Sequence, residues 1–210
     1  MKQPVARDTS REEVMRYAEE AFMKQGIRSV KMDDIAEHLG MSKRTLYEMF
    51  ENKEALLLDV MCRHRQEFYR KLEACAAGTD NILEIVLQSF LMQYKDLRQT
   101  NPRCFEEIKR YPKVEEYLKE VHDSEAEKAI AYMEKGVGQG MFRSDVNLRI
   151  FHSMLEEVMR FVFRVERGNR FPLLELYSSC FLVILRGICT LRGLQVLDKF
   201  LAENDADFNN

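Results

Sequence analysis

Proline and glycine are scarce in this sequence, whose 210 residues include only four prolines and nine glycines. The sequence also lacks stretches in which apolar and polar residues alternate, the pattern of a half-buried strand. Because proline and glycine are the residues that most often end regular structure, these absences favour a chain built from helices alone. With 46% hydrophobic and 32% charged residues, the composition is that of a globular protein that can bury a core.

Long hydrophobic runs are lacking as well. The longest, Cys180–Leu185, ends at Arg186 and is far shorter than the ~20 apolar residues of a membrane-spanning helix. We therefore expect no membrane segment. The sequence has no signal-peptide pattern, and its five cysteines are odd in number and form no CxxC pair, which together predict a reducing, cytoplasmic location.

Catalytic and cofactor motifs are missing too. There is no GxGxxG, P-loop, GxSxG or HExxH pattern, and the four histidines are dispersed. Cys62, His64 and Glu67 are close in sequence, but residues two apart project from different faces of a helix. We therefore expect no enzymatic activity, no cofactor and no bound metal. A switch based on thiol oxidation or on a metal stays open as an alternative, although a buried cysteine usually behaves as a small hydrophobic residue.

Basic residues are not in excess. The formal net charge is −3, the isoelectric point is about 5.9, and the first 53 residues carry as many acidic as basic side chains. This balance counts against a protein that is basic throughout. It does not exclude DNA binding, because phosphate contacts need only a local basic surface.

Helix signals divide the chain into about nine helices. Ser10 and Glu13 fit the capping-box pattern, and Gly26 is expected to end the helix that starts there. Asn52 and Asn147 are expected to cap later helices. Residues 82–97 are apolar on nearly every side, which is typical of a helix in the middle of a bundle. Other helices are expected from Pro102, from Pro112 and over 172–192, with loops at Gly136–Gly140 and Gly168–Pro172, a disordered arm at 1–8 and frayed residues at 202–210.

The most informative pattern lies between Ser29 and Lys53. Gly40 stands where a helix end needs a left-handed backbone, and Ser42 is a cap for the helix that follows. A helix, a glycine-containing turn and a capped second helix are characteristic of a helix-turn-helix. Lys43 and Arg44 occupy the first turn of the second helix, where the helix dipole disfavours cations. Their position therefore indicates nucleic-acid binding.

This segment and the helix before it resemble the DNA-binding domain of the TetR family of bacterial transcriptional regulators, over roughly residues 10–60. The resemblance implies an all-α protein with a small N-terminal three-helix helix-turn-helix DNA-binding domain at 1–52. A larger helical bundle for ligand binding and dimerisation is expected at 53–210. The residues that carry the resemblance are Ala21, Phe22, Gly26, Met32, Asp33, Asp34, Ile35, Ala36, Leu39, Gly40, Ser42, Lys43, Thr45, Leu46, Tyr47, Phe50, Lys53, Glu54 and Leu56.

The predicted DNA contacts lie at the starts of two helices. Lys43 and Arg44 suit guanine O6 and N7 or a phosphate. The resemblance implies that Tyr47 and Lys53 contact backbone phosphate and that Thr45 lies at the groove. Leu46 and Phe50 are expected in the core. The full set of predicted DNA-binding residues is Arg28, Ser29, Lys31, Ser42, Lys43, Arg44, Thr45, Tyr47 and Lys53.

The sequence departs from the family pattern at the starts and surfaces of these helices. Lys31 stands where the family usually has threonine or serine, so Ser29 or the backbone is expected to cap the first helix of the motif. Glu48 and Glu51 bring negative charge to the second helix and the residues after it. Glu48 either accepts from a cytosine amine or faces solvent.

The second domain is expected to hold a pocket and a dimer interface. Aromatic and flexible apolar residues suit a pocket, although core packing would use the same residues, and Arg98, His122 and His152 are candidate polar anchors. In the resembling family the last long helices form a four-helix interface with a second copy. The predicted pocket residues are Phe90, Tyr94, Phe105, Tyr117, Val121, Met133, Phe151 and Met159, and the predicted interface residues are Leu155, Val162, Tyr177, Phe181, Ile184 and Ile188.

These patterns predict a ligand-responsive transcriptional repressor. We expect it to bind a palindromic operator in double-stranded DNA as a homodimer and to be released by an unknown small apolar effector. Two alternatives stay open. One is a DNA-binding regulator switched through its cysteines or a metal, and the other is a helical interaction protein that has lost DNA binding.

Overall fold

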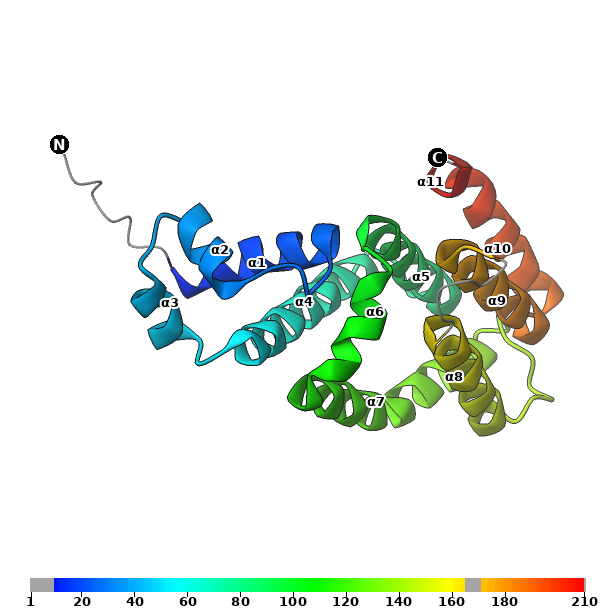
Figure 1. Cartoon of the computed structure of the whole chain (residues 1–210). Coiled ribbons are helices and arrows are strands. Elements are labelled where there is room, and N and C mark those ends of the chain that lie inside the picture. Colours follow the sequence, from blue (N-terminus) through cyan, green and yellow to red (C-terminus); the bar gives the residue numbers. More distant parts are fainter. Residues whose placement is uncertain (1–9, 165–170, 210) are drawn as a thin grey trace. The chain divides into compact units, whose positions relative to one another are not determined.

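A computed structural model of the chain describes residues 10–164 and 171–209 (Figure 1). Within these residues the chain forms eleven α-helices and one short 3-10 helix, and the only strand-like pairing described is an isolated bridge between Phe142 and Cys189. The all-helical prediction is confirmed. The arm predicted at 1–8 and most of the loop predicted at Gly168–Pro172 lie outside the described residues. None of the described helices is long and apolar enough to cross a membrane.

The chain divides into two compact units. The first spans Met1–Glu67 and Gln99–Lys119, and the second spans Phe68–Arg98 and Glu120–Asn210. The functional boundary predicted after residue 52 stays a prediction. The helices in chain order are α1 (Arg11–Gln25), α2 (Met32–His38), α3 (Lys43–Met49), α4 (Lys53–Ala76), α5 (Ile82–Gln99), α6 (Arg103–Glu107), the 3-10 helix η1 (Ile108–Arg110), α7 (Pro112–Gly138), α8 (Leu148–Arg164), α9 (Leu173–Ile188), α10 (Leu191–Glu203) and α11 (Asp205–Asn209).

Helix α1 begins and ends where the sequence predicts. The Ser10 hydroxyl accepts a hydrogen bond from the Glu13 N–H at 3.2 Å, which satisfies one of the free donors of the first turn. Gly26 ends the helix with a φ of 87°, a conformation that side chains strongly disfavour.

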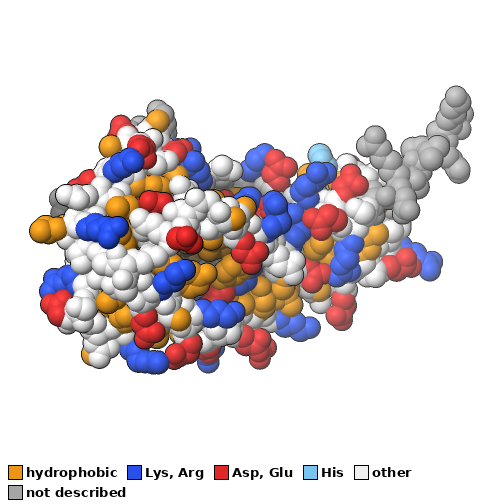
Figure 2. Space-filling model, turned by 180° about the vertical axis from the view of Figure 1, so that it is seen from behind, with side chains coloured by type: hydrophobic (Ala, Val, Ile, Leu, Met, Phe, Trp, Pro, Cys, Tyr) orange, Lys and Arg blue, Asp and Glu red, His pale blue; other side chains and the backbone are white. Residues whose placement is uncertain are grey.

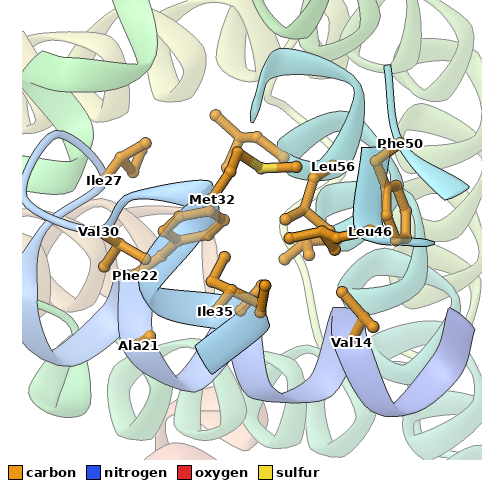
Figure 3. Close-up of a cluster of buried hydrophobic side chains, with 14 of the residues drawn as sticks. Val14, Ala21, Phe22, Ile27, Val30, Met32, Ile35, Leu46, Phe50 and Leu56 are labelled. Carbon is orange, nitrogen blue, oxygen red and sulfur yellow. The ribbon is translucent and has the colours of Figure 1, made fainter. Parts of the chain in front are cut away.

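The core of the first unit draws its side chains from α1 to α4. Figure 3 shows Val14 and Phe22 of α1, Ile35 of α2, Leu46 of α3 and Leu56 of α4 converging on one buried cluster. Each of the short helices α2 and α3 is too short to be stable alone, so this shared burial holds them in place.

The starts of α4 and α8 also agree with the predictions. Asn52 accepts from the Ala55 N–H at 2.9 Å, and Asn147 accepts from the Arg149 N–H at 3.1 Å. The predicted burial of the 82–97 helix is confirmed as well. Residues around most of α5 are buried, namely Ile82, Leu83, Ile85, Leu87, Phe90, Leu91 and Tyr94.

The loop predicted at Gly136–Gly140 begins later than expected, because α7 continues to Gly138. Gly136 is helical and faces the Phe142 ring so closely that a Cβ atom there would overlap it. This glycine therefore serves close packing within the second unit. Gly140, with a φ of 71°, is the residue that makes the turn.

The C-terminal region is more structured than predicted. The last helix was expected to run to about residue 192, but α9 ends at Ile188 and α10 begins at Leu191. The Thr190 N–H donates to the Met141 carbonyl at 2.9 Å, and the Thr190 hydroxyl caps α10 by accepting from the Gly193 N–H at 3.1 Å. Residues 202–209, predicted to fray, lie mostly in α10 and α11.

Candidate nucleic-acid interface

The turn between α2 and α3 has the predicted helix-turn-helix geometry. Gly40 adopts a φ of 65°, and the Met41 N–H donates back to the Ala36 carbonyl at 3.0 Å. The Ser42 hydroxyl then caps α3 by accepting from the Thr45 N–H at 3.0 Å. The Ser42 and Thr45 hydroxyls also lie 2.7 Å apart, so both predicted contact residues help to start the helix.

Helix α3 has one buried and one exposed face. Leu46 and the following Phe50 are buried, as predicted. Lys43, Arg44 and the aromatic side chain of Tyr47 are exposed. The exposed face therefore presents two cations and a phenol on a helix whose opposite face is fixed in the core.

Both cations of this face have carboxylate partners in the free protein. The Lys43 ammonium lies 2.6 Å from Asp33 of α2, and Arg44 Nε donates to Glu48 at 2.8 Å, four residues along the same helix. All four side chains are exposed, and such pairs add little to stability. The partners can therefore be exchanged for DNA at low cost. Glu48 thus lies beside Arg44 and holds it along the helix surface.

Lys53 lies in a different environment. It is the first residue of α4, and its ammonium lies 3.4 Å from the Arg28 carbonyl and 5.8 Å from the centre of the Phe22 ring. Burial lowers the pKa of Lys53, against the smaller opposing effects of Glu107 and Asp34. The contacts with Arg28 and Phe22 hold the ammonium near the N-terminus of a long helix, where free N–H groups and the helix dipole favour an anion.

The residues between α1 and α2 divide into two exposed cations and a structural serine. Arg28 and Lys31 are exposed. The Ser29 hydroxyl donates to the Gln25 carbonyl at 2.6 Å and thus closes the end of α1. Of the two caps expected for α2, Ser29 or the backbone, the Ser29 side chain is thus not the one used. The Asp34 carboxylate instead accepts from the Lys31 N–H at 3.4 Å.

Charges of both signs are mixed over the surface. On the face that Figure 2 shows, lysine and arginine side chains are interspersed with aspartate and glutamate. This agrees with the net charge of −3. A net charge of this kind gives no overall attraction to DNA, so binding would depend on a local arrangement of cations.

The second unit contains a cavity of about 550 Å³. Of the predicted pocket residues, Met133 and Phe151 line it. Phe90 and Tyr94 are buried instead in an aromatic cluster with Tyr177, and Met159 packs against this cluster. Phe105 and Tyr117 belong to the first unit, and Val121 does not line the cavity. The cavity is also lined by residues that the sequence analysis did not predict as pocket residues, among them Tyr69, Leu72, Ile85, Val86, Ser89, Tyr132, Phe142 and Leu185.

The predicted interface residues face the interior of the second unit. Val162, Tyr177 and Ile188 are buried, and the cavity is lined by Leu155, Phe181 and Ile184 together with Ile188. The apolar residues that α8 and α9 expose are others, namely Ile150, Met154, Phe161 and Val183. Their spacing on α8, with Met154 four and Phe161 eleven residues after Ile150, defines a second apolar stripe.

The thiols and histidines of the described residues form no metal site: no group of three potential ligands is close enough there. Cys104 and Cys189 are buried, and burial raises the pKa of the Cys104 thiol and raises that of Cys189 to about 11. Because the thiolate is the reactive form, these two cysteines are poorly suited to redox sensing.

Comparisons with known proteins agree with this geometry. Residues 14–60 match the family described as bacterial regulatory proteins, tetR family. The chain is 26% identical over 167 residues to the HTH-type transcriptional repressor KstR2 of Rhodococcus jostii (strain RHA1), covering 75% of this chain and 82% of that protein. It is 36% identical over 76 residues to the HTH-type transcriptional activator FasR of Mycolicibacterium smegmatis, covering 36% of this chain and 35% of FasR.

The fold is similar to solved structures of transcriptional regulators. A regulator from Saccharomonospora viridis, solved in complex with choline, matches with a TM-score of 0.67 and 18% identity. The match covers 86% of this chain and 97% of that one. At this identity the likeness concerns the fold.

Proposed function

Because the chain belongs to the TetR family of bacterial regulatory proteins and is a DNA-binding transcriptional regulator, not an enzyme, we propose that it is a repressor that binds a palindromic operator as a homodimer. We further propose that a small apolar molecule in the cavity of the second unit releases it from DNA. KstR2 of Rhodococcus jostii, which matches 75% of this chain, is named a repressor, which supports this direction of regulation.

The observation that carries the proposal is the exposed face of α3. Lys43, Arg44 and Tyr47 are exposed while Leu46 is buried, so the rigid core aims donors outward from a helix-turn-helix. Lys53 adds a half-buried ammonium at the start of α4. We propose that Arg44 reads a base and that Lys43, Tyr47 and Lys53 contact phosphate, with Arg28, Ser29, Lys31, Ser42 and Thr45 close to the duplex.

The cavity supports the effector part of the proposal. Its volume of about 550 Å³ lies within the range of about 300–1,000 Å³ typical of small-molecule sites. Its lining is mostly aromatic and aliphatic. A ligand acts by favouring one of two arrangements of the DNA-binding units, so it must bind these arrangements with different affinities.

The exposed apolar side chains of α8 and α9, namely Ile150, Met154, Phe161 and Val183, support the proposed dimer. Phe161 is 59% and Val183 is 70% exposed, and α8 and α9 pack side by side (Figure 1). Large exposed apolar side chains grouped on neighbouring helices mark interaction surfaces. A two-fold dimer through this stripe would present two DNA-binding units to half-sites roughly 34 Å apart.

The test is binding to the DNA upstream of the gene, which is first searched for a palindrome. Fluorescence anisotropy with a labelled duplex measures affinity at several salt concentrations and against single-base variants. Arg44→Ala should cost about 1–3 kcal/mol at particular operator positions, and Lys53→Ala should weaken binding to all sequences about equally. Arg143→Ala is the matched control, since Arg143 is an exposed, carboxylate-paired arginine of the second unit.

Specific binding should exceed non-specific binding by about 4–10 kcal/mol and should weaken steeply with salt. Binding that is absent, or insensitive to salt, would support the alternative of an interaction protein. Equal, sequence-independent losses in Arg44→Ala and Lys53→Ala would show that Arg44 reads no base.

A further inference from the structure

A pair of histidines shares one glutamate at the wall of the cavity in the second unit. Glu156 Oε1 of α8 lies 2.9 Å from Nε2 of His122 on α7 and 3.3 Å from Nδ1 of His152 on α8. His152 lines the cavity, with its side chain only 13% exposed, whereas His122 is exposed and does not line it. The shielded histidine therefore faces the place where a ligand would lie.

The position of Glu156 sets which ring nitrogen of His152 carries the proton. An unprotonated Nδ1 would direct its lone pair against the carboxylate oxygen, so a neutral ring keeps its proton on Nδ1. Nε2 is then a hydrogen-bond acceptor.

The charged groups of the lining favour no anion, and its neutral polar side chains include Ser89, Gln93 and Tyr132. Glu73 and Lys128 are both exposed and have opposite charges, so their fields offset each other and are weakened by water. The Tyr69 hydroxyl already donates to Glu125. The charge nearest to His152 is the carboxylate of Glu156, which is only 21% exposed and would repel a ligand carboxylate.

From this arrangement we infer that the cavity selects an apolar molecule with one hydroxyl group, which donates its proton to Nε2 of His152. Glu156 acts through His152 as a positioning residue, and the aromatic and aliphatic walls bind the apolar part. The inference rests on the proposed function only in treating the cavity as an effector site. A ketone or a carboxylate of the same length has no proton to donate and should bind less tightly.

The test compares three probes with the same carbon chain, namely decanol, decanone and decanoate, by isothermal titration calorimetry on the full chain. Decanol should bind about tenfold more tightly than decanone, equal to about 1.4 kcal/mol, a value expected for one hydrogen bond. His152→Leu should weaken decanol binding about tenfold and leave decanone binding nearly unchanged. Comparing variants with one probe cancels the cost of removing that probe from water.

Conservative variants separate hydrogen bonding from packing. His152→Gln keeps a hydrogen-bond acceptor and should keep part of the preference for decanol over decanone. It also replaces His152→Leu in the comparison if that variant unfolds at the temperature of the titration. Glu156→Gln permits either protonated nitrogen in His152, so the preference for decanol over decanone should shrink. Glu203→Gln is the matched control, because Glu203 is an exposed glutamate of the same unit that pairs with Lys199 and does not line the cavity.

The inference is overturned if decanone or decanoate binds more tightly than decanol, if His152→Leu weakens all three probes equally, or if none of them binds. The proposed function is tested separately by operator affinity without any probe. Selective decanol binding that leaves operator affinity unchanged would contradict the effector role but keep the hydroxyl site. Operator release by a compound that lacks a hydroxyl would keep the effector role and remove the hydroxyl site.

Discussion

The ammonium of Lys43 lies 2.6 Å from the carboxylate of Asp33, so an ion pair joins α3 to α2 on the exposed side of the helix-turn-helix. The hydrogen bond to Asp33 raises the pKa of Lys43, which keeps it a cation. The same ammonium is a proposed phosphate ligand. Asp33 therefore competes with DNA for Lys43.

Asp33→Asn should strengthen DNA binding several-fold, because it removes a negative charge near the phosphates and frees Lys43. Thermal stability should change little, since exposed ion pairs contribute little. Anisotropy titrations measure the affinity, and Asp145→Asn, which removes an exposed paired carboxylate in the second unit, is the control. Weaker DNA binding in Asp33→Asn would show instead that Asp33 holds Lys43 in its binding position.

Leu46→Ala and Tyr47→Ala should affect different properties, stability and DNA binding respectively, although the residues are adjacent on α3. Leu46 is completely buried, so its truncation should cost about 2–5 kcal/mol of unfolding free energy. Tyr47 is exposed, so its truncation should change stability by less than about 0.5 kcal/mol and weaken DNA binding. Urea denaturation and anisotropy measure the two effects. A large loss of stability in Tyr47→Ala would contradict its placement on the binding face.

Phe161→Glu should convert the proposed dimer to monomers, because it places a charge in the proposed apolar interface. Sedimentation velocity measures the association state, and circular dichroism should show unchanged helix content because Phe161 is exposed. Gln195→Glu, at an exposed position of α10, is the control. An unchanged association state in Phe161→Glu would place the interface elsewhere.

Gly136→Ala and Gly138→Ala should differ in sign. A Cβ at Gly136 would overlap the Phe142 ring, whereas Gly138 has open space around it. Overpacking should cost Gly136→Ala about 1–3 kcal/mol, and Gly138→Ala should gain up to about 1 kcal/mol from the smaller entropy of its unfolded chain. Thermal denaturation of both variants measures the difference, and equal effects would contradict the close packing at Phe142.

Local rules predicted the first unit well. The caps at Ser10, Ser42 and Asn52 and the glycine turn at Gly40 each depend on residues within a few positions, so the sequence contains the whole signal. The burial of Leu46 and Phe50 was predicted as well and is confirmed. The DNA contacts themselves stay a prediction, which the exposed placement of Arg44 supports.

The second unit could not be predicted in the same detail, because its decisive contacts join distant residues. Between α9 and α10, the Thr190 N–H donates to the Met141 carbonyl and the Thr190 hydroxyl donates to the Gly140 carbonyl, so a turn about fifty residues away holds this junction. Helix α8 carries two apolar stripes, and spacing alone does not say which one is buried. Val162 and Phe161 are neighbours in sequence, yet the first is buried and the second exposed.

The carboxylate of Glu107 accepts a hydrogen bond from the Arg28 N–H at 2.8 Å and lies against Gly26. The Asn101 N–H likewise donates to the Met23 carbonyl at 2.7 Å. The end of α1 is thus completed by a segment about eighty residues further along the chain. A truncated protein that stops after residue 52 would lose these partners and part of the hydrophobic core. Chimaeras that transfer this operator specificity to another regulator should therefore include residues 99–119 together with the helix-turn-helix.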